Sequence, residues 1–340
     1  MKMKKLINKE EKIFIAGSSG MVGSAIKRSL VGKGYGDENQ GGSILCPTRK
    51  NLDLEDSLEV ENWFKIHKPT VVIIAAAKVG GIYANSSMPY EFLINNLKIQ
   101  TNLIEQSFLN NVKRLLFLGS SCIYPKLSKQ PILEEYLLSD YLEKTNETYA
   151  LAKITGIKLC QSLRKQYGFD AISLMPSNLY GPGDNYHHLD SHVLPALIKK
   201  ILDAKLTGKN DIVCWGTGKP LREFLYVDDL ADACIFALEK WDPNSNDAPK
   251  DINGEILYWL NVGSKFEISI KELVQMISNQ CDYKGKITWD DSKPDGTYRK
   301  KLNTARLSKL GWNSYTNLEV GIKKTITSFL YEKKMNTVRI

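Results

Sequence analysis

The stretch KIFIAGSSGMVGSAI, residues 12–26, decides the fold. An apolar run leads into the spacing Gly17-x-x-Gly20-x-x-Gly23, and a helical pattern begins within the glycine motif. Gly17 allows a tight turn, Gly20 lets the backbone approach a pyrophosphate, and Gly23 lets the helix pack closely on the strand. The helix N-terminus adds unpaired N–H groups for phosphate oxygens. We therefore predict a dinucleotide-binding unit here rather than a plain structural turn.

Short apolar runs alternate with helical patterns through the first half of the chain. The runs that we predict to be strands are residues 12–17, 43–48, 70–77, 114–120 and 170–181. Continuous apolar strands separated by helices indicate a parallel sheet that is covered on both faces. We predict an α/β fold, with a Rossmann doubly wound parallel sheet and a smaller C-terminal α/β substrate domain.

The second half of the chain is less regular and suggests an interleaved domain organisation. We expect a cofactor-binding domain over residues 10–182, with returning segments near 224–263. The substrate-binding domain would then comprise 183–223 and 264–335. The stretch 34–42 looks like an enlarged surface loop, because it is rich in glycine and polar residues.

Composition narrows the class of protein. The 340 residues are 43% hydrophobic and 25% charged, which is typical of a soluble globular protein. No stretch approaches the ~20 apolar residues of a membrane span, and the basic start lacks the apolar segment of a secretory signal. The six cysteines are scattered, which predicts neither a disulfide framework nor a zinc site and suits a reducing cytoplasm.

The net charge of +8 allows two interpretations. It reflects either a solvated basic surface or a partner that carries phosphates. Nucleic acid is one such partner, but no segment has the dense basic and aromatic pattern typical of nucleic-acid binding. We expect neither nucleic acid nor a membrane as a partner.

The choice of dinucleotide depends on the residues after the second strand. NAD enzymes place a carboxylate there, on the ribose 2′-OH. The segment CPTRKNLDL, residues 46–54, instead offers Arg49 and Lys50 first. A guanidinium suits a 2′-phosphate through its paired N–H donors. We predict NADP(H), with an ordinary surface position for Arg49 as the alternative.

Two further motifs suggest catalysis. In ETYALAKITG, residues 147–156, Tyr149 and Lys153 share one helix face. A cation beside a phenol lowers the pKa of the phenol, which makes Tyr149 a usable proton donor to a carbonyl under reduction. In LGSSCIYPK, which follows a predicted strand, an extended backbone would put Ser120 and Cys122 on one face.

With these pieces the chain resembles the extended short-chain dehydrogenase/reductases. Within that family it is similar to the group that epimerises and reduces GDP-4-keto-6-deoxy-D-mannose. The similar motifs are AAAKVGGI (75–82), LGSSCIYPK (118–126), MPSNLYGPGDNYH (175–187), WGTGKPLREFLYVDDLA (215–231) and SKPDGTYRKKL (292–302). The resemblance implies a Rossmann fold, a catalytic set of Ser120, Tyr149 and Lys153, and a GDP-sugar held by the C-terminal domain.

The resemblance also implies a two-step reaction. Cys122 and His192 would be the acid/base pair for epimerisation at C3 and C5. NADPH would then reduce C4 while Tyr149 donates a proton, giving GDP-L-fucose. Ser120 would hydrogen-bond the substrate oxygen and the tyrosine, and Lys153 would also bind the nicotinamide ribose. A cytoplasmic homodimer without a metal is expected.

Binding residues are carried over at matching positions. Along the cofactor the resemblance implies Gly17, Ser18, Ser19, Gly20, Met21, Val22, Gly23, Arg49, Asp53, Leu54, Leu118, Gly119, Ser120, Ser121, Lys153, Pro176, Ser177, Asn178, Leu179 and His192. Facing the GDP-sugar it implies Lys200, Trp215, Arg222, Asp295 and Lys300. Two departures stand out: Ser18-Ser19 replaces a basic residue of some relatives, and Lys200 replaces an arginine that could grip phosphate with two N–H groups.

Other interpretations remain open from the residues alone. Cys122 could be a buried filler, Trp215 a core residue and Arg222 part of a surface ion pair. His187, His188 and His192 lie near Asp190, but the spacing suggests no further metal ligand. Rival functions are a nucleotide-sugar 4-epimerase or dehydratase that retains NAD, and a non-catalytic Rossmann protein that senses NADP(H) or binds RNA.

Overall fold

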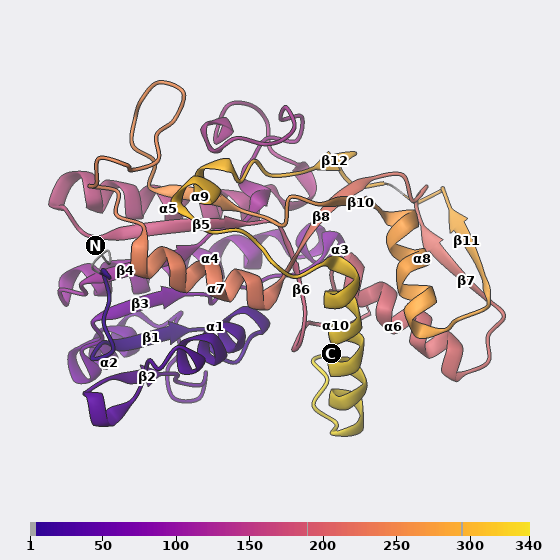
Figure 1. Cartoon of the computed structure of the whole chain (residues 1–340), viewed down its shortest axis with the longest axis horizontal. Coiled ribbons are helices and arrows are strands. Elements are labelled where there is room, and N and C mark those ends of the chain that lie inside the picture. The colour runs from indigo at the N-terminus through magenta and orange to yellow at the C-terminus, as the bar shows by residue number, and fades with distance from the viewer. Residues whose placement is uncertain (1–4, 189, 294) are drawn as a thin grey trace.

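The computed structural model describes residues 5–188, 190–293 and 295–340. Its central feature is a six-stranded sheet of order β2-β1-β3-β4-β5-β9, in which all neighbouring strands run parallel (Figure 1). The strands are β1 (Lys12–Ala16), β2 (Ser43–Leu45), β3 (Val71–Ile74), β4 (Arg114–Leu118), β5 (Ala171–Pro176) and β9 (Trp259–Val262). The predicted doubly wound parallel sheet is confirmed.

Two groups of helices cover this sheet. One group consists of α1 (Met21–Gly32) and α7 (Val227–Lys240), which pack on each other. In the other group, α4 (Pro89–Leu109) packs on both α2 (Ser57–His67) and α5 (Glu147–Tyr167). Because both faces of the sheet are covered, the inner strands β3 and β4 are buried along their whole length rather than at alternate residues.

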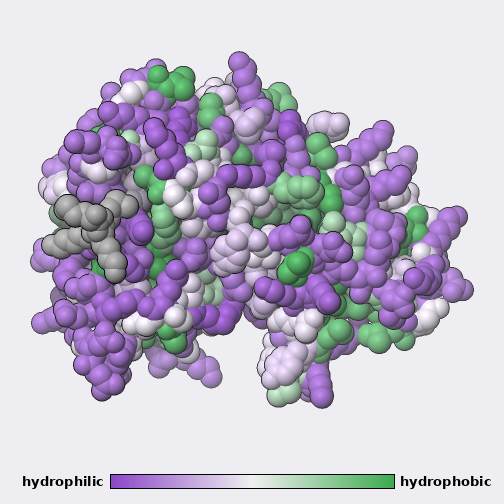
Figure 2. All heavy atoms as spheres, in the orientation of Figure 1, coloured by the Kyte–Doolittle hydropathy of each residue, from purple (hydrophilic) through white to green (hydrophobic). Residues whose placement is uncertain are grey.

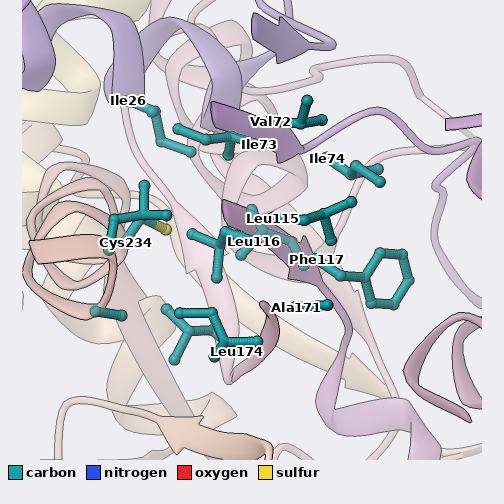
Figure 3. Close-up of a cluster of buried hydrophobic side chains, with 14 of the residues drawn as sticks. Ile26, Val72, Ile73, Ile74, Leu115, Leu116, Phe117, Ala171, Leu174 and Cys234 are labelled. Carbon is teal, nitrogen blue, oxygen red and sulfur yellow. The ribbon is translucent and has the colours of Figure 1, made fainter. Parts of the chain in front are cut away.

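The core beneath α1 and α7 is shown in Figure 3. Ile26 from α1 and Cys234 from α7 lie beside Ile73 and Leu116 of the central strands. All four side chains are fully buried. Complete burial of one aliphatic side chain stabilises a fold by about 1.5–3 kcal/mol. The sheet is therefore a firm base for the loops that follow its strands.

A second body carries two further sheets and lies to the right in Figure 1. Its larger sheet has the order β10-β8-β12, with β6 also paired to β8, and its smaller sheet pairs β7 with β11. The strands are β6 (Asn178–Tyr180), β7 (Asp211–Trp215), β8 (Leu221–Tyr226), β10 (Glu267–Ser269), β11 (Lys286–Asp290) and β12 (Arg299–Lys300). The helices are α6 (Val193–Leu206), α8 (Ile270–Cys281) and α10 (Leu318–Lys334).

The chain passes between the two bodies several times. Within the expected returning segment 224–263, α7 and β9 join the first core, whereas β8, half of which lies before the segment, pairs in the second body. Leu302, Leu307 and Trp312 also pack in the first core. The domain boundaries stay a prediction, but these contacts show that residues from late in the sequence reach the Rossmann sheet.

Short helices fill several connections. They are η1 (Glu38–Gln40), α3 (Ile82–Ser87), η2 (Ser121–Ile123), η3 (Glu134–Tyr136), η4 (Lys144–Asn146) and α9 (Ala305–Leu310). The first of these lies in the 34–42 stretch, where Gly36 and Gly41 have positive φ angles. In the described ranges, no helix combines the length and apolar character that crossing a membrane requires. Figure 2 shows polar side chains over much of one face, with apolar residues in scattered groups.

Candidate active site

The glycine loop joins β1 closely to α1. Gly17 has a φ of +83°, and a Cβ at this position would lie 2.7 Å from the backbone of Ala76. A Cβ at Gly23 would lie 2.1 Å from the Gly17 carbonyl oxygen. Gly20 is the N-cap residue of α1, where no side chain caps the helix and no acidic residue occupies the first turn. The first turn therefore keeps N–H groups for an anionic ligand.

The remaining residues of the glycine loop lie beside the N-terminus of α1. Ser18 and Ser19 lie between the first two glycines, and the partly buried Met21 and Val22 pack their side chains against the core. This packing leaves the backbone of the first turn as the part of the loop that can meet a phosphate.

Arg49 lies after β2 and extends into solvent. Its side chain is 80% exposed, and its Nη2 lies 3.4 Å from Glu55 Oε1. Asp53 accepts a hydrogen bond from the Glu55 N–H at 3.0 Å, and the Leu54 carbonyl accepts one from Asn102 at 3.0 Å. An ion pair this exposed holds its partners weakly. The guanidinium is therefore free to turn toward a phosphate, and its role stays a prediction.

The loops after β4 and β5 form another part of the expected cofactor surface. Leu118 ends β4, and a Cβ on Gly119 would lie 2.3 Å from Met175 Sδ, so a larger residue there would require Met175 to move. Pro176 ends β5, and the buried Ser177 hydroxyl has no partner among the described residues. An unpartnered buried hydroxyl is costly and suits a bound ligand.

Neighbouring residues fix these loops. Asn178 donates from Nδ2 to the Glu223 carbonyl at 2.9 Å, Leu179 packs against the first core, and Ser121 is buried. The backbone around the unpartnered Ser177 hydroxyl is thus held by both bodies, since Glu223 belongs to β8.

Ser120, Tyr149 and Lys153 come together where β4 ends beside α5. Tyr149 is half-buried and hydrogen-bonded with Ser120. The buried Lys153 donates from Nζ to the Leu118 carbonyl at 2.9 Å. Its Nζ lies 4.9 Å from the ring centroid of Phe117. The helix predicted from the i, i+4 spacing is present as α5 and brings this set together.

The expected lowering of the Tyr149 pKa by Lys153 is wrong for this structure. Burial raises the pKa of Tyr149 and the nearby Cys122 raises it further, while the hydrogen bond with Ser120 opposes the rise. Burial also lowers the pKa of Lys153 to about 8, and its Nζ is 6.0 Å from the Tyr149 ring centroid. Tyr149 is therefore protonated at neutral pH, which is the state that a proton donor needs.

Cys122 does not follow Ser120 in an extended segment, so that expectation was wrong. Residues Ser121–Ile123 form the 3₁₀ turn η2, and the Ser120 hydroxyl caps it by accepting from the Cys122 N–H at 3.2 Å. The turn places the partly exposed Cys122 on a small pocket that Thr297 and Lys300 also line. Lys300 Nζ lies 3.5 Å from Cys122 Sγ.

His192 is the N-cap residue of α6, and its side chain remains accessible to solvent. Desolvation by the surrounding protein lowers the pKa of His192, and the Lys300 ammonium lowers it further. The neutral imidazole is consequently favoured near pH 7. Lys300 thus acts electrostatically on His192 while it contacts Cys122, so the two members of the expected acid/base pair share one cationic neighbour.

Arg222 and Lys300 form a pair of cations on adjacent strands. They are register partners between β8 and β12. Burial lowers the pKa of Arg222, while Asp295 and Cys122 raise it. Asp295 accepts from the backbone N–H and the hydroxyl of Thr217 at 2.9 and 2.7 Å. This arrangement presents positive charge next to Cys122.

Lys200 and Trp215 belong to a different part of the second body. Lys200 donates from Nζ to the Val213 carbonyl at 2.8 Å. Trp215 is 64% exposed at the end of β7, and Lys293 Nζ lies 5.7 Å from its ring centroid. The interpretation of Trp215 as a core residue is therefore wrong, and its flat face is accessible for stacking.

His187 and Asp190 contact each other in the histidine-rich loop. His187 Nδ1 lies 3.2 Å from Asp190 Oδ2, and the Asp190 N–H donates to the same nitrogen at 3.2 Å. Within residues 5–188, 190–293 and 295–340, no three His, Cys, Asp or Glu side chains are grouped as metal ligands would be.

The comparisons with known proteins agree with this geometry. The family model of the NAD-dependent epimerase/dehydratase family matches residues 13–253. GDP-L-fucose synthase 1 of Arabidopsis thaliana is 48% identical over 323 residues, which cover 95% of this chain and 94% of that protein. The chain belongs to the NAD-dependent epimerase/dehydratase family. The predicted resemblance to the epimerase/reductase group is confirmed.

Solved structures of family members match almost the whole chain. A GDP-6-OMe-4-keto-L-xylo-heptose reductase from Campylobacter jejuni has a TM-score of 0.87 and 33% identity, covering 96% of this chain and 99% of its own. A GDP-L-fucose synthetase from Naegleria fowleri, bound to NADP, has a TM-score of 0.84 and 26% identity, with 99% of both chains covered. Both bodies of the fold are therefore shared with these enzymes.

The sequence did not point to two residues that lie beside the predicted catalytic set. Asn146 donates from Nδ2 to Cys122 Sγ at 3.2 Å. Phe92 of α4 packs edge-on against Tyr149, with ring centroids 6.4 Å apart. A signal for Asn146 was available, because Asn146, Tyr149 and Lys153 are spaced by three and four residues and share one helix face. No comparable signal existed for Phe92, which depends on how α4 packs against α5.

Proposed function

We propose that this protein converts GDP-4-keto-6-deoxy-D-mannose into GDP-L-fucose, by epimerisation at C3 and C5 and NADPH-dependent reduction at C4. The observation that carries the proposal is the meeting of two chemical sets at one strand end. Ser120 contacts Tyr149, as reduction needs, and Cys122 contacts Lys300, which also influences His192. The 48% identity to GDP-L-fucose synthase 1 of Arabidopsis thaliana supports the substrate.

NADP(H) fits the residues of the first body. The close-packed glycines at 17 and 23, the uncapped start of α1 and the unpartnered Ser177 hydroxyl provide sites for phosphate and ribose oxygens. Arg49 would meet the 2′-phosphate. When bound, the reduced cofactor supplies the hydride for C4. Lys153 would hold the nicotinamide ribose, since its pKa of about 8 leaves it mostly charged at neutral pH.

Epimerisation uses the acidity that the C4 ketone gives to the C–H bonds at C3 and C5. Cys122 as the thiolate accepts a proton from carbon, an S–H bond forms, and the C–H electron pair moves to the ketone oxygen. The imidazolium form of His192 then gives a proton to the opposite face of the same carbon and inverts it, and proton exchange with solvent restores the thiolate and the imidazolium. A thiol suits this task because its reference pKa, about 8.5, allows proton loss and gain near neutrality.

Reduction requires a proton for the C4 oxygen. A phenol is protonated at neutral pH, and burial raises the pKa of Tyr149 further, so Tyr149 keeps its proton until negative charge develops on that oxygen. Ser120 hydrogen-bonds with the phenol and lies beside the same oxygen in the proposed complex. The two residues therefore act on C4 without needing Cys122.

The cations of the second body suit a diphosphate. Arg222 and Lys300 lie on paired strands, and Lys200 adds a charge beside β7. Asp295 is held by Thr217 near the Arg222 guanidinium, and Trp215 offers an exposed ring for a base. We propose these five residues as the GDP-sugar site.

We also propose a cytoplasmic homodimer. The dimer is supported by exposed apolar side chains at the ends of α4 and α5, namely Tyr90 at 70%, Leu109 at 59% and Tyr167 at 58% exposure. The location is supported by the scattered cysteines, which suit a reducing compartment. Light scattering coupled to size-exclusion chromatography tests the oligomeric state, and a mass of about 38.4 kDa would contradict the dimer.

The decisive test of the function is incubation of the purified protein with GDP-4-keto-6-deoxy-D-mannose and NADPH, with product stereochemistry read by NMR. The proposal expects GDP-L-fucose, with both C3 and C5 inverted. Reduction without inversion would make the protein a plain C4 reductase, the activity in the name of the Campylobacter jejuni neighbour. Tightly retained NAD after purification and no net NADPH oxidation would favour a 4-epimerase or dehydratase.

A further inference from the structure

Asn146 lies at the start of α5, one helix turn before Tyr149. Its amide nitrogen donates to Cys122 Sγ at 3.2 Å, while its Oδ1 is buried and has no partner among the described residues. Of the two polar atoms of the Asn146 side chain, only Nδ2 makes a hydrogen bond among the described residues, and its acceptor is the Cys122 sulfur. The sulfur contact is therefore what orients the amide.

The position makes this orientation unusual. Asn146 is the N-cap residue of α5, where asparagine ordinarily accepts a hydrogen bond from an N–H of the first turn. Here its side chain makes no such capping bond. The loss of an asparagine cap costs a helix about 0.5–2 kcal/mol. Asn146 could cap the helix, but it donates to the Cys122 thiol instead. This choice indicates a role in the chemistry of the thiol.

A second donor contacts the same sulfur. Lys300 Nζ lies 3.5 Å from Cys122 Sγ, and it comes from β12 of the second body. The Cys122 N–H is bonded to Ser120 Oγ, so the backbone of the residue is also fixed. Donors from Asn146 and Lys300 therefore contact the sulfur beside the pocket that Cys122 and Lys300 line.

We propose that Asn146 is a positioning residue that holds the Cys122 sulfur toward the sugar, through its amide N–H hydrogen bond, for proton removal at C3 and C5. The sugar part of this inference rests on the proposed function. The hydrogen-bond part does not, because it concerns a contact within the protein. Asn146 also extends the face of α5 that carries Tyr149 and Lys153, so one helix serves both steps.

The test compares Asn146→Asp with Asn146→Ala. Aspartate is nearly the same size and can cap a helix as well as asparagine, but it offers sulfur an acceptor instead of a donor. The readout is the rate at which iodoacetamide alkylates Cys122 at pH 7, measured by mass spectrometry of the peptide. Cys46, which is also partly exposed, serves as the internal reference.

We expect Asn146→Asp and Asn146→Ala each to lower the Cys122-to-Cys46 rate ratio about ten-fold or more, the scale of a hydrogen bond to a charged group. The difference in this rate ratio between the parent protein and the variants should narrow at pH 9.5, where most thiols are ionised. Parental reactivity in Asn146→Asp, with loss only in Asn146→Ala, would mean that Asn146 supports the helix end or accepts from the thiol, and the proposal would be wrong.

A second readout connects the contact to the reaction. Solvent deuterium incorporation into the keto-sugar at C3 and C5, without NADPH, should fall with the alkylation rate in both variants. Unchanged exchange despite slower alkylation would overturn the role of Asn146 in catalysis. If the parent protein itself exchanges no deuterium, the proposed function fails, while the alkylation ratio still decides whether Asn146 controls the thiol.

Discussion

At the scale of single residues, loss of water shifts the pKa values of Tyr149 and Lys153 more strongly than their neighbours do. The sequence led us to expect that Lys153 would lower the Tyr149 pKa, yet burial moves the pKa of the phenol up and that of the ammonium down. Spacing on a helix predicted that both residues share a face. It could not predict burial, because burial depends on the loops that cover the face.

The first prediction concerns Tyr149 as proton donor. Tyr149→Phe removes only the hydroxyl, so folding and NADPH binding should persist while the reduction rate falls by about 10²–10⁴-fold, the contribution of general acid catalysis. Stopped-flow measurement of NADPH oxidation with the keto-sugar checks this. Deuterium exchange at C3 and C5 serves as the control and should survive. Reduction within a few-fold of the parent would exclude Tyr149 as the donor.

The second prediction concerns Arg49 and cofactor choice. Among the residues that the structure describes, its exposed side chain has a hydrogen bond or ion pair only with Glu55, at 3.4 Å, so Arg49→Ala should leave the fold unchanged. Loss of a charge-assisted phosphate contact, about 1.5–3 kcal/mol, should weaken NADPH binding by about ten- to a hundred-fold. NADH lacks the phosphate and should bind nearly as before. Calorimetric titration of the parent protein and Arg49→Ala with each cofactor measures both affinities. Equal weakening of NADPH and NADH binding would contradict a contact between Arg49 and the 2′-phosphate.

At the scale of elements, the apolar runs located the five N-terminal strands of the main sheet, because buried parallel strands need continuous apolar sequence. The glycine spacing located the start of α1 for a steric reason that the structure makes explicit. The segment after β4 was misjudged as extended. Its 3₁₀ turn depends on the Ser120 cap and on contacts from other elements, which a short local pattern does not reveal.

The third prediction tests the close packing of α1. Gly23→Ala places a methyl group 2.1 Å from the Gly17 carbonyl oxygen, so the free energy of unfolding should fall by about 1–3 kcal/mol and NADPH should bind more weakly. Gly32→Ala in the same helix is the matched control, because its Cβ meets nothing within 4 Å. The free energy of unfolding of Gly32→Ala should rise by up to about 1 kcal/mol. Urea unfolding of both variants measures the difference, and equal stabilities would contradict the steric argument.

At the scale of the whole molecule, the site joins residues that the sequence separates widely. Cys122 and Lys300 meet at 3.5 Å across 178 positions, because β12 pairs with β8 of the second body. Motif resemblance named both residues as part of the site, but their contact could not be predicted from spacing. It depends on the interleaving of the two bodies, through which the chain returns to the first core after residue 300.

The last prediction follows from this assembly of two chemical sets in one place. In Cys122→Ser the hydroxyl cannot exchange protons near neutrality as a thiol can, so deuterium incorporation at C3 and C5 without NADPH should be nearly abolished. Ser120 and Tyr149 contact each other without the thiol, so NADPH oxidation with an already epimerised ketone should continue. The negative charge of Cys122 is one cause of the raised Tyr149 pKa. Cys122→Ser removes that charge, so Tyr149 should remain at least as acidic as in the parent protein.

Tyr149→Phe is the reciprocal control for this experiment, because it should keep exchange and lose reduction. The two variants together separate the two steps at a single site. Cys122→Ser should lose exchange and keep reduction, whereas Tyr149→Phe should keep exchange and lose reduction. Parental exchange rates in Cys122→Ser would show that the thiol only packs there. Loss of both activities in Cys122→Ser, in a protein that still binds NADPH, would show that the two sets are not separable. Either result would require a different base for the epimerisation or a shared role for Cys122 in both steps.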